Sequence, residues 1–167
     1  WRWKARTAGG YESQAMYEYD NANNGDDYLI SPALHLIKGA RYRVRFAYAG
    51  ANAHHTEKLE VTFGNGRTAQ SQTQVIKSLT MNDGEFRTCE IDLPEVDATG
   101  YYHFAFHAIS DAKQFNIYVT DVKVDMTVAP PSAGGDDDYE FTAPAYVKVT
   151  PDHANQSALI EWSMTPV

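Results

Sequence analysis

The sequence predicts an all-β fold, an antiparallel sandwich of two sheets. Apolar and polar residues alternate with a period of two in several segments, which places successive side chains on opposite faces of a strand. Turn signals separate these segments, and no stretch carries apolar residues at helical spacing over three turns. Many short strands, each with one apolar face, are typical of two antiparallel sheets that pack face to face.

The most regular strand is predicted at 41–48, where Tyr42, Val44, Phe46 and Tyr48 share one face and three arginines share the other. The same alternation predicts further strands at 58–63, 89–93, 102–108 and 115–119. The turn signals that bound them are Lys38–Gly39, Gly64–Asn65–Gly66, Asn82–Asp83–Gly84 and Thr99–Gly100.

The composition excludes several classes of function. The 167 residues are 43% hydrophobic and 22% charged, which is ordinary for a globular protein and argues against wholesale disorder. Acidic residues outnumber basic ones 22 to 14, which gives a net charge of −8. Binding to nucleic acid or to anionic lipid depends on clustered Lys and Arg, so the charge argues against both. No apolar run is long enough for membrane insertion. The single cysteine, Cys89, excludes an intrachain disulfide and a thiolate zinc site.

A domain boundary is predicted after residue 128. Residues 129–140 contain adjacent prolines, adjacent glycines and three consecutive aspartates, a composition typical of a linker. Beyond it, Tyr146–Val149 and Ala158–Trp162 are two strand candidates, too few to form a stable core alone. Residues 141–167 are therefore interpreted as an incomplete second module that needs support from the first domain or from a neighbour.

Residues 27–36, the turn Lys38–Gly39 and the strand 42–48 resemble the first part of a choice-of-anchor, cleaved-adhesin type jelly-roll domain. Later blocks of that pattern match 57–61, 101–108 and 117–122 in the right order, so the resemblance covers about residues 1–128. Residues 141–167 are similar to the first two strands of a fibronectin type III module.

The resemblance implies a jelly-roll sandwich related to carbohydrate-binding modules, commonly with structural calcium. It implies a non-catalytic module of a larger secreted or surface-anchored bacterial protein, hence an extracellular or cell-surface location. The resemblance does not name a ligand.

An acidic, amide-rich loop is the first candidate site. Asp20, Asn24, Asp26 and Asp27 supply carboxylate and amide oxygens at a density that suits the six to eight ligands of Ca²⁺. The loop is not an EF-hand, because Ser31 stands where the bidentate glutamate belongs. A solvated turn rich in Asn, Asp and Gly remains the alternative.

Two further carboxylates are predicted to face inward. Glu57 shares parity with Leu59 and Val61, and Asp121 shares parity with Ile117, after which the apolar phase flips as at a β-bulge. A buried carboxylate must be paired, hydrogen-bonded or bound to a metal. Together with the resemblance, this predicts a structural calcium site at Glu57 and Asp121, with ligands from the 20–27 loop; pairing with backbone amides or an arginine is the alternative.

Other reactive residues give weaker signals. His103 and His107 lie about 13 Å apart if they occupy one strand at about 3.3 Å per residue, too far for one zinc ion. Cys89 shares the phase of Ile91 and Leu93, which predicts a buried and inert thiol. No nucleophile elbow, phosphate loop or dinucleotide fingerprint is present, so the sequence does not predict an enzyme.

Tyrosines and arginines supply candidate ligand-binding residues. Tyr28 and Tyr101 fall outside the inward phase, where a flat amphipathic ring suits a sugar face or a protein hot spot, although edge strands also use such rings structurally. Arg41, Arg43 and Arg45 form a basic stripe that either pairs with Glu60 or other acids on adjacent strands or binds acidic glycans or carboxylates of a partner.

The sequence therefore predicts a non-catalytic binding or adhesion module for a glycan or a host surface protein. The rival is a purely structural spacer that positions neighbouring domains of the parent chain. The chain begins at Trp1 with neither an initiator methionine nor a leader, so we expect a piece of a longer protein, which the resemblance implies is exported.

Overall fold

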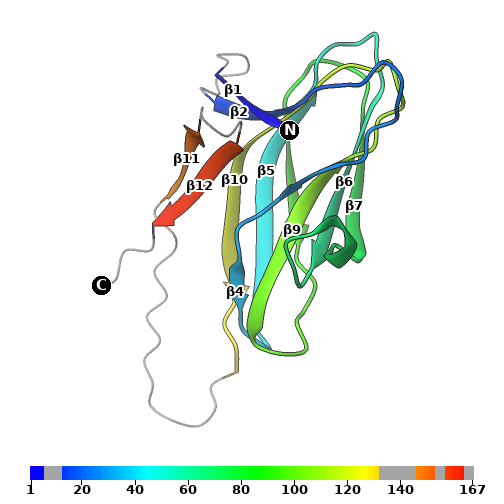
Figure 1. Ribbon diagram of the computed structural model, residues 1–167. Helices are drawn as coiled ribbons and strands as arrows, with labels where there is room; N and C mark the ends of the chain where they lie inside the picture. The colour runs from blue at the N-terminus through cyan, green and yellow to red at the C-terminus, as the bar shows by residue number, and fades with distance from the viewer. Residues whose placement is uncertain (6–12, 132–145, 153–156, 164–167) are drawn as a thin grey trace.

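The computed structural model describes residues 1–5, 13–131, 146–152 and 157–163, and it shows an all-β protein built of two antiparallel sheets (Figure 1). Sheet A contains, in spatial order, β1 (Arg2–Ala5), β2 (Ser13–Tyr17), β10 (Ile117–Val128), β5 (Arg41–Gly50) and β8 (Arg87–Asp92). Sheet B contains β3 (Asp27–Ile30), β9 (Gly100–Ala108), β6 (Glu57–Gly64) and β7 (Gln74–Met81), and β4 (Leu34–Leu36) also pairs with β9.

The two sheets pack through the faces that the sequence alternation marks as apolar. Val44 and Phe46 of β5 and Leu59 of β6 are all 0% exposed. The rings of Phe46 and Phe106 meet edge to face across the sandwich with centroids 4.8 Å apart. The predicted all-β sandwich is therefore confirmed, with the core where alternate residues of the central strands point inward.

Strand β7 and the short N-terminal strands were not predicted from the pattern. In β7 the inward residues Leu79 and Met81 are buried, but Val75 is 52% exposed, so the strand lacks a continuous apolar face. Such an edge strand is held by its ladder with β6 and not by a full stripe of buried side chains.

Strand β10 contains the bulge that the phase flip predicts. Its pairing with β5 shifts register between Thr120 and Lys123, and Asp121 adopts a left-handed backbone with φ of 50°. Ile117 and Val119 face the core before the bulge, and Val124 packs against the core after it. Because the bulge adds one residue to β10, odd-numbered residues face the core before it and even-numbered residues face the core after it.

The C-terminal segment contains an antiparallel hairpin of β11 (Tyr146–Asp152) and β12 (Ser157–Ser163). This confirms the two predicted strands. Most of the predicted linker and parts of the fibronectin-like segment lie outside the described residues. The linker and the likeness to a fibronectin type III module therefore stay predictions. In the described part of the chain, no helix is long and apolar enough to cross a membrane.

Candidate ligand-binding site on the outer face of sheet B

The outer face of sheet B brings together side chains from three neighbouring strands. The ladder pairs Tyr28 of β3 with His107 of β9, and His107 in turn with Glu60 of β6. Residues paired across antiparallel strands lie on the same face, so these three side chains form one row. Asp26, just before β3, reaches the same histidine. Tyr28, His107, Asp26 and Glu60 are called the Tyr28 cluster below.

The Tyr28 cluster is a stacked pair of rings flanked by two carboxylates. The rings of Tyr28 and His107 stack at 3.9 Å between centroids, with an angle of 12° between their planes. His107 Nε2 lies 2.8 Å from Asp26 Oδ1, and its Nδ1 lies 3.5 Å from Glu60 Oε2. The two carboxylates fix the imidazole through its two ring nitrogens, and the imidazole stacks on the tyrosine ring.

The side chains of the cluster differ in their exposure to solvent. The His107 side chain is 12% exposed and that of Glu60 is 23% exposed, whereas that of Asp26 is 86% exposed. Burial raises the pKa of the Tyr28 hydroxyl, and the negative charges of Asp26 and Glu60 raise it further. The phenol therefore stays protonated at neutral pH and can donate a hydrogen bond, while the carboxylates can accept bonds from a ligand.

Sequence reasoning found Tyr28 but missed His107 as a site residue. The parity of β9 carried a signal, because Tyr102, Phe104 and Phe106 face inward and His107 therefore faces outward. His103, on the same outward phase, lies 4% exposed with Nδ1 2.8 Å from the carbonyl oxygen of Ser31. The two histidines have separate partners, as their spacing predicts.

A loop covers the middle of the same face. Gln72, which follows the 3₁₀ helix η2 (Ala69–Ser71), accepts a hydrogen bond from the Thr62 hydroxyl at 3.2 Å. A Cβ on Gly64 would lie 1.7 Å from the Ser71 carbonyl oxygen, so this backbone contact requires glycine. Thr62 is 1% exposed under the loop.

Tyr101 lies on the same strand as His107 but not in the cluster. It is 67% exposed and its ring centroid lies 5.2 Å from that of His35 on β4. His107 lies six positions beyond Tyr101 on β9, roughly 20 Å at about 3.3 Å per residue. The fold therefore puts the two predicted tyrosines on one face but at opposite ends of it.

The three arginines lie on sheet A and are paired with acids of adjacent segments. Arg43 Nε donates to Asp92 at 2.7 Å, and Arg45 lies 3.7 Å from Glu90. The predicted pairing with acids across the strand is confirmed, with β8 as the partner strand.

Glu60 is not the arginines' partner as expected, because β6 belongs to sheet B and its carboxylate contacts His107. Arg41 pairs with Glu95 at 2.8 Å, in the segment that follows β8.

The predicted calcium loop forms hydrogen bonds within itself and with the segment that follows β9. Asp20 Oδ1 accepts hydrogen bonds from the amides of Ala22 and Asn23 at 2.6 and 2.9 Å, and these bonds lower the pKa of Asp20. Asn24 Oδ1 accepts from the amide of Ala112 at 3.0 Å. Asp27 is exposed at the start of β3, where its carbonyl oxygen accepts a bond from the Trp1 indole.

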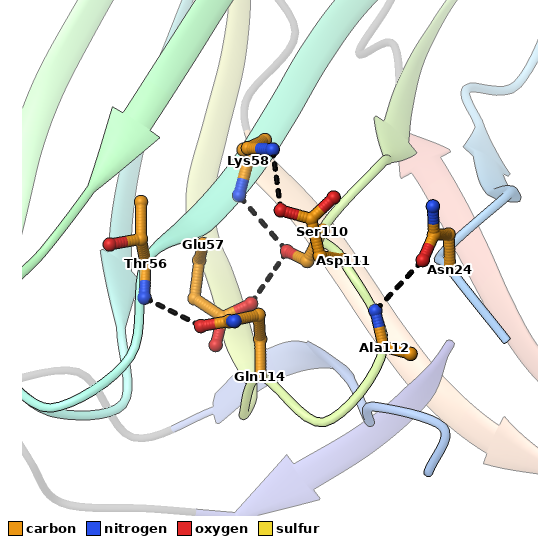
Figure 2. A network of polar contacts seen from close by, with 8 residues as sticks. All are labelled: Asn24, Thr56, Glu57, Lys58, Ser110, Asp111, Ala112 and Gln114. Atoms are coloured by element: carbon orange, nitrogen blue, oxygen red, sulfur yellow. Dashed lines mark hydrogen bonds and ion pairs between the residues drawn. The ribbon is translucent and has the colours of Figure 1, made fainter. Parts of the chain in front are cut away.

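Glu57 belongs to a network of polar contacts whose outer members are exposed (Figure 2). It is 0% exposed, as its inward phase predicts. The Ser110 hydroxyl donates to one carboxylate oxygen at 2.6 Å, and the amide of Phe115 donates to the other. Ser110 also accepts from the Lys58 amide at 2.9 Å, while Lys58 Nζ pairs with Asp111 at 2.7 Å. The expected alternative for a buried carboxylate, hydrogen bonding to a backbone amide, is therefore present.

The inward orientation predicted for Asp121 is wrong. Its side chain is 43% exposed and pairs with Lys123 Nζ at 2.9 Å. The left-handed backbone of the bulge turns the carboxylate out to solvent, whereas unbroken alternation places it inside. Glu57 and Asp121 consequently have different partners. Among the described residues, no group of three or more His, Cys, Asp or Glu side chains is placed to hold a metal ion.

Cys89 is buried, as predicted. It is 9% exposed, and burial raises the pKa of its thiol, which disfavours the reactive thiolate.

The two layers and their strand order form a jelly-roll sandwich. No protein-family model matches the sequence, and no curated protein matches it. Among solved structures, the chain is similar to a cleaved adhesin domain of Lys-gingipain from Porphyromonas gingivalis, with a TM-score of 0.59 and 22% identity over 74% of this chain and 82% of that one.

Two carbohydrate-binding modules have a similar fold. The C-terminal family 22 module of Clostridium thermocellum Xyn10B gives a TM-score of 0.54 at 10% identity, over 74% of this chain and 78% of that one. TmCBM61, solved in complex with beta-1,4-galactotriose, gives 0.51 at 17% identity, over 74% and 80%. At these identities the similarity establishes the fold, and the predicted likeness to cleaved adhesin domains is confirmed at that level.

Proposed function

We propose that this protein is a non-catalytic binding module that recognises a glycan through the Tyr28 cluster. The observation that carries the proposal is the stacked Tyr28–His107 pair with a carboxylate at each imidazole nitrogen. A sugar ring offers an apolar face to an aromatic ring and hydroxyl groups to carboxylate oxygens. The highly exposed Asp26 places such an oxygen at the solvent side of the cluster.

The fold similarity supports the same class of function. The structural neighbours include two carbohydrate-binding modules and an adhesin domain of a bacterial protein. By this analogy the chain serves a larger exported protein at the cell surface or outside the cell. A host surface protein is the second ligand class, since aromatic rings with polar flanks also serve as protein hot spots.

Glycan-array binding of the full chain tests the proposal. We expect the wild-type protein to bind a defined set of glycans, Tyr28→Ala to lose that binding, and Asp26→Asn to weaken it. Asp26 is highly exposed, so its variant leaves the fold intact and keeps the test valid if Tyr28→Ala is unstable. Arg43→Gln on sheet A is the control and should bind as the wild type does. Binding that survives both cluster variants contradicts the proposed site.

A protein without any glycan or host-protein ligand would instead be the structural spacer that the sequence also allows. In that case the array and a panel of matrix proteins both give no signal. The Tyr28 cluster would then serve only to join β3 to β9 and β6.

We also propose that a structural calcium ion binds near Glu57. Two buried acceptors support this. The Glu57 carboxyl has no ion pair with a described cationic side chain, and Asn116, which follows Phe115, has a buried Oδ1 without a hydrogen-bond partner among the described residues. A hard cation favours such oxygens. We expect EDTA to lower the Tm by several degrees in the wild type and not in Glu57→Gln. An unchanged wild-type Tm contradicts the site.

A further inference from the structure

The outer face of sheet A contains a buried strip that the core does not explain. Tyr118 of β10 pairs with Met16 of β2 on one side and with Ala49 of β5 on the other, so the three form one row. They are 3%, 4% and 1% exposed, respectively. Their phase is opposite to that of the core residues Ile117 and Val119, so they point away from sheet B.

Gln14 of β2 and Ala47 of β5, on the same face, are each 1% exposed, and the face opens to solvent further along β10 and on β8. Lys123 and Asp125, further along β10, are exposed, and so is Thr88 on β8. Burial is therefore concentrated around the start of β10. The row of Met16, Tyr118 and Ala49 within it is called the Tyr118 strip below. A strip of low exposure on an outward face requires another segment of the chain to lie over it.

The C-terminal hairpin is the segment placed to do this. Strand β12 contacts β1, the edge strand of sheet A next to β2, and Figure 1 shows the hairpin on the side of the sandwich that sheet A forms. A two-stranded hairpin is at best marginally stable alone in water and gains stability by packing on an apolar surface. The Tyr118 strip provides that surface.

The chain between β10 and the hairpin is long enough for the hairpin to reach the Tyr118 strip. A Cβ on Gly39 would lie 2.8 Å from Pro131 Cδ, so the start of the linker is held at the turn before β5, near the far end of β10. The 12 residues of β10 extend roughly 40 Å at about 3.3 Å per residue. Residues 132–145 reach up to about 50 Å when extended, which is enough to return along β10 to the Tyr118 strip.

We propose that the hairpin β11–β12 docks on the Tyr118 strip and fixes the following module against the outer face of sheet A. This docking is independent of the proposed glycan binding. It places the next module against sheet A, on the side of the sandwich away from sheet B. The Tyr28 cluster on the outer face of sheet B therefore stays accessible.

Methionine oxidation of the full chain tests the docking directly. Met16 lies in the strip, whereas Met81 lies in the core with 0% exposure and serves as the internal control. Ile160→Pro removes a backbone donor in β12, where Ile160 pairs with Val149, and so breaks the hairpin without touching the sandwich. With hydrogen peroxide and peptide mapping, we expect Met16 to oxidise at least tenfold faster in Ile160→Pro than in the wild type, with Met81 protected in both.

A second pair of variants keeps the test valid if Ile160→Pro destabilises the whole protein. Tyr118→Glu places a charge in the strip, and Thr88→Glu places one at an exposed site of the same face. We expect amide exchange in β12 to accelerate in Tyr118→Glu and to stay unchanged in Thr88→Glu. Met16 that remains protected in Ile160→Pro, or β12 exchange that is the same in both glutamate variants, would overturn the proposal.

Discussion

The outer faces of the two sheets both carry charged side chains, but they arrange them differently. On sheet A, Arg43 of β5 faces Asp92 of β8 directly across the ladder, at 2.7 Å. On sheet B, Asp26 and Glu60 approach one imidazole, that of His107, from opposite sides. The first arrangement sets arginines of one strand against carboxylates of the next, and the second gathers two carboxylates around one stacked ring.

This difference indicates which face can bind a ligand. A carboxylate that pairs with an arginine across a ladder has its charge satisfied within the sheet, and such exposed pairs contribute little to stability. The Tyr28 cluster leaves the Asp26 carboxylate 86% exposed beside an aromatic ring. The partners of a charged residue, more than the charge itself, therefore distinguish a solvated face from a candidate site.

The largest effect is expected from a change to the loop on sheet B. Gly64→Ala puts a Cβ within 1.7 Å of the Ser71 carbonyl oxygen, and this backbone atom cannot move as a side chain does. We expect a loss of about 2–3 kcal/mol in the free energy of unfolding, measured by urea denaturation. Gly100→Ala is the control, because its Cβ meets Tyr102 at an ordinary 3.7 Å. Equal stability of the two variants would show that the loop does not rest on β6.

An intermediate effect is expected on affinity. Asp26→Asn keeps the shape of the side chain and removes its charge, so we expect about tenfold weaker binding to a glycan identified on the array, roughly 1.4 kcal/mol. Isothermal titration calorimetry measures this. Asp125→Asn is the matched control on sheet A, where Asp125 pairs in the ladder with Arg43. Similar losses in both variants would remove the distinction between the two faces.

A smaller effect is expected from the charged ladder of sheet A. Arg43→Gln removes the contacts with Asp92 and Glu90, whose side chains are 69% and 47% exposed. We expect the free energy of unfolding to fall by less than about 1 kcal/mol, and by less still in high salt. Denaturation at two salt concentrations measures this, and a loss above about 2 kcal/mol would contradict the view of this face as solvated.

The smallest effect concerns the titration of Asp92. The hydrogen bond from Arg43 lowers its pKa below the usual value of about 3.9. A carboxyl with a depressed folded pKa contributes stability above its unfolded pKa and loses that contribution as the pH falls through the folded pKa. We therefore expect this contribution to fade only below about pH 4.

NMR titration of the carboxyl resonances measures the shift. In Arg43→Gln the pKa of Asp92 should rise toward the ordinary value. The pKa of Asp20 should stay low, because the amides of Ala22 and Asn23 lower it. A pKa of Asp92 that does not respond to the substitution would contradict the role of Arg43.

The sequence predicts the fold well where alternate residues are buried between two sheets. Strand β5 shows this directly, because every second side chain from Tyr42 to Tyr48 is in the core. Strand β7 could not be found in this way, since its burial is limited to the end that contains Leu79 and Met81. The position of the bulge was predictable from the phase flip, but the direction of Asp121 depends on its left-handed backbone, which sequence periodicity does not encode.

The candidate site was predictable only in part. Tyr28 follows from its outward phase and its chemistry. Its relation to His107 depends on the pairing of β3 with β9, strands far apart in the sequence, and Asp26 reaches His107 across 81 positions. Contacts at such separations come from the topology of the sandwich and not from local spacing.

The place where the linker leaves the sandwich has a mechanical consequence. The linker continues from β10, which lies between β2 and β5 in the interior of sheet A. A pull on the linker therefore acts along the strand axis, at right angles to the backbone hydrogen bonds that join β10 to β5 from Ile117 to Val128. Bonds loaded in shear share the force and must break together, whereas an edge strand peeled from its end loses them singly. The linker end of the sandwich is therefore expected to resist tension better than the end formed by the edge strand β1.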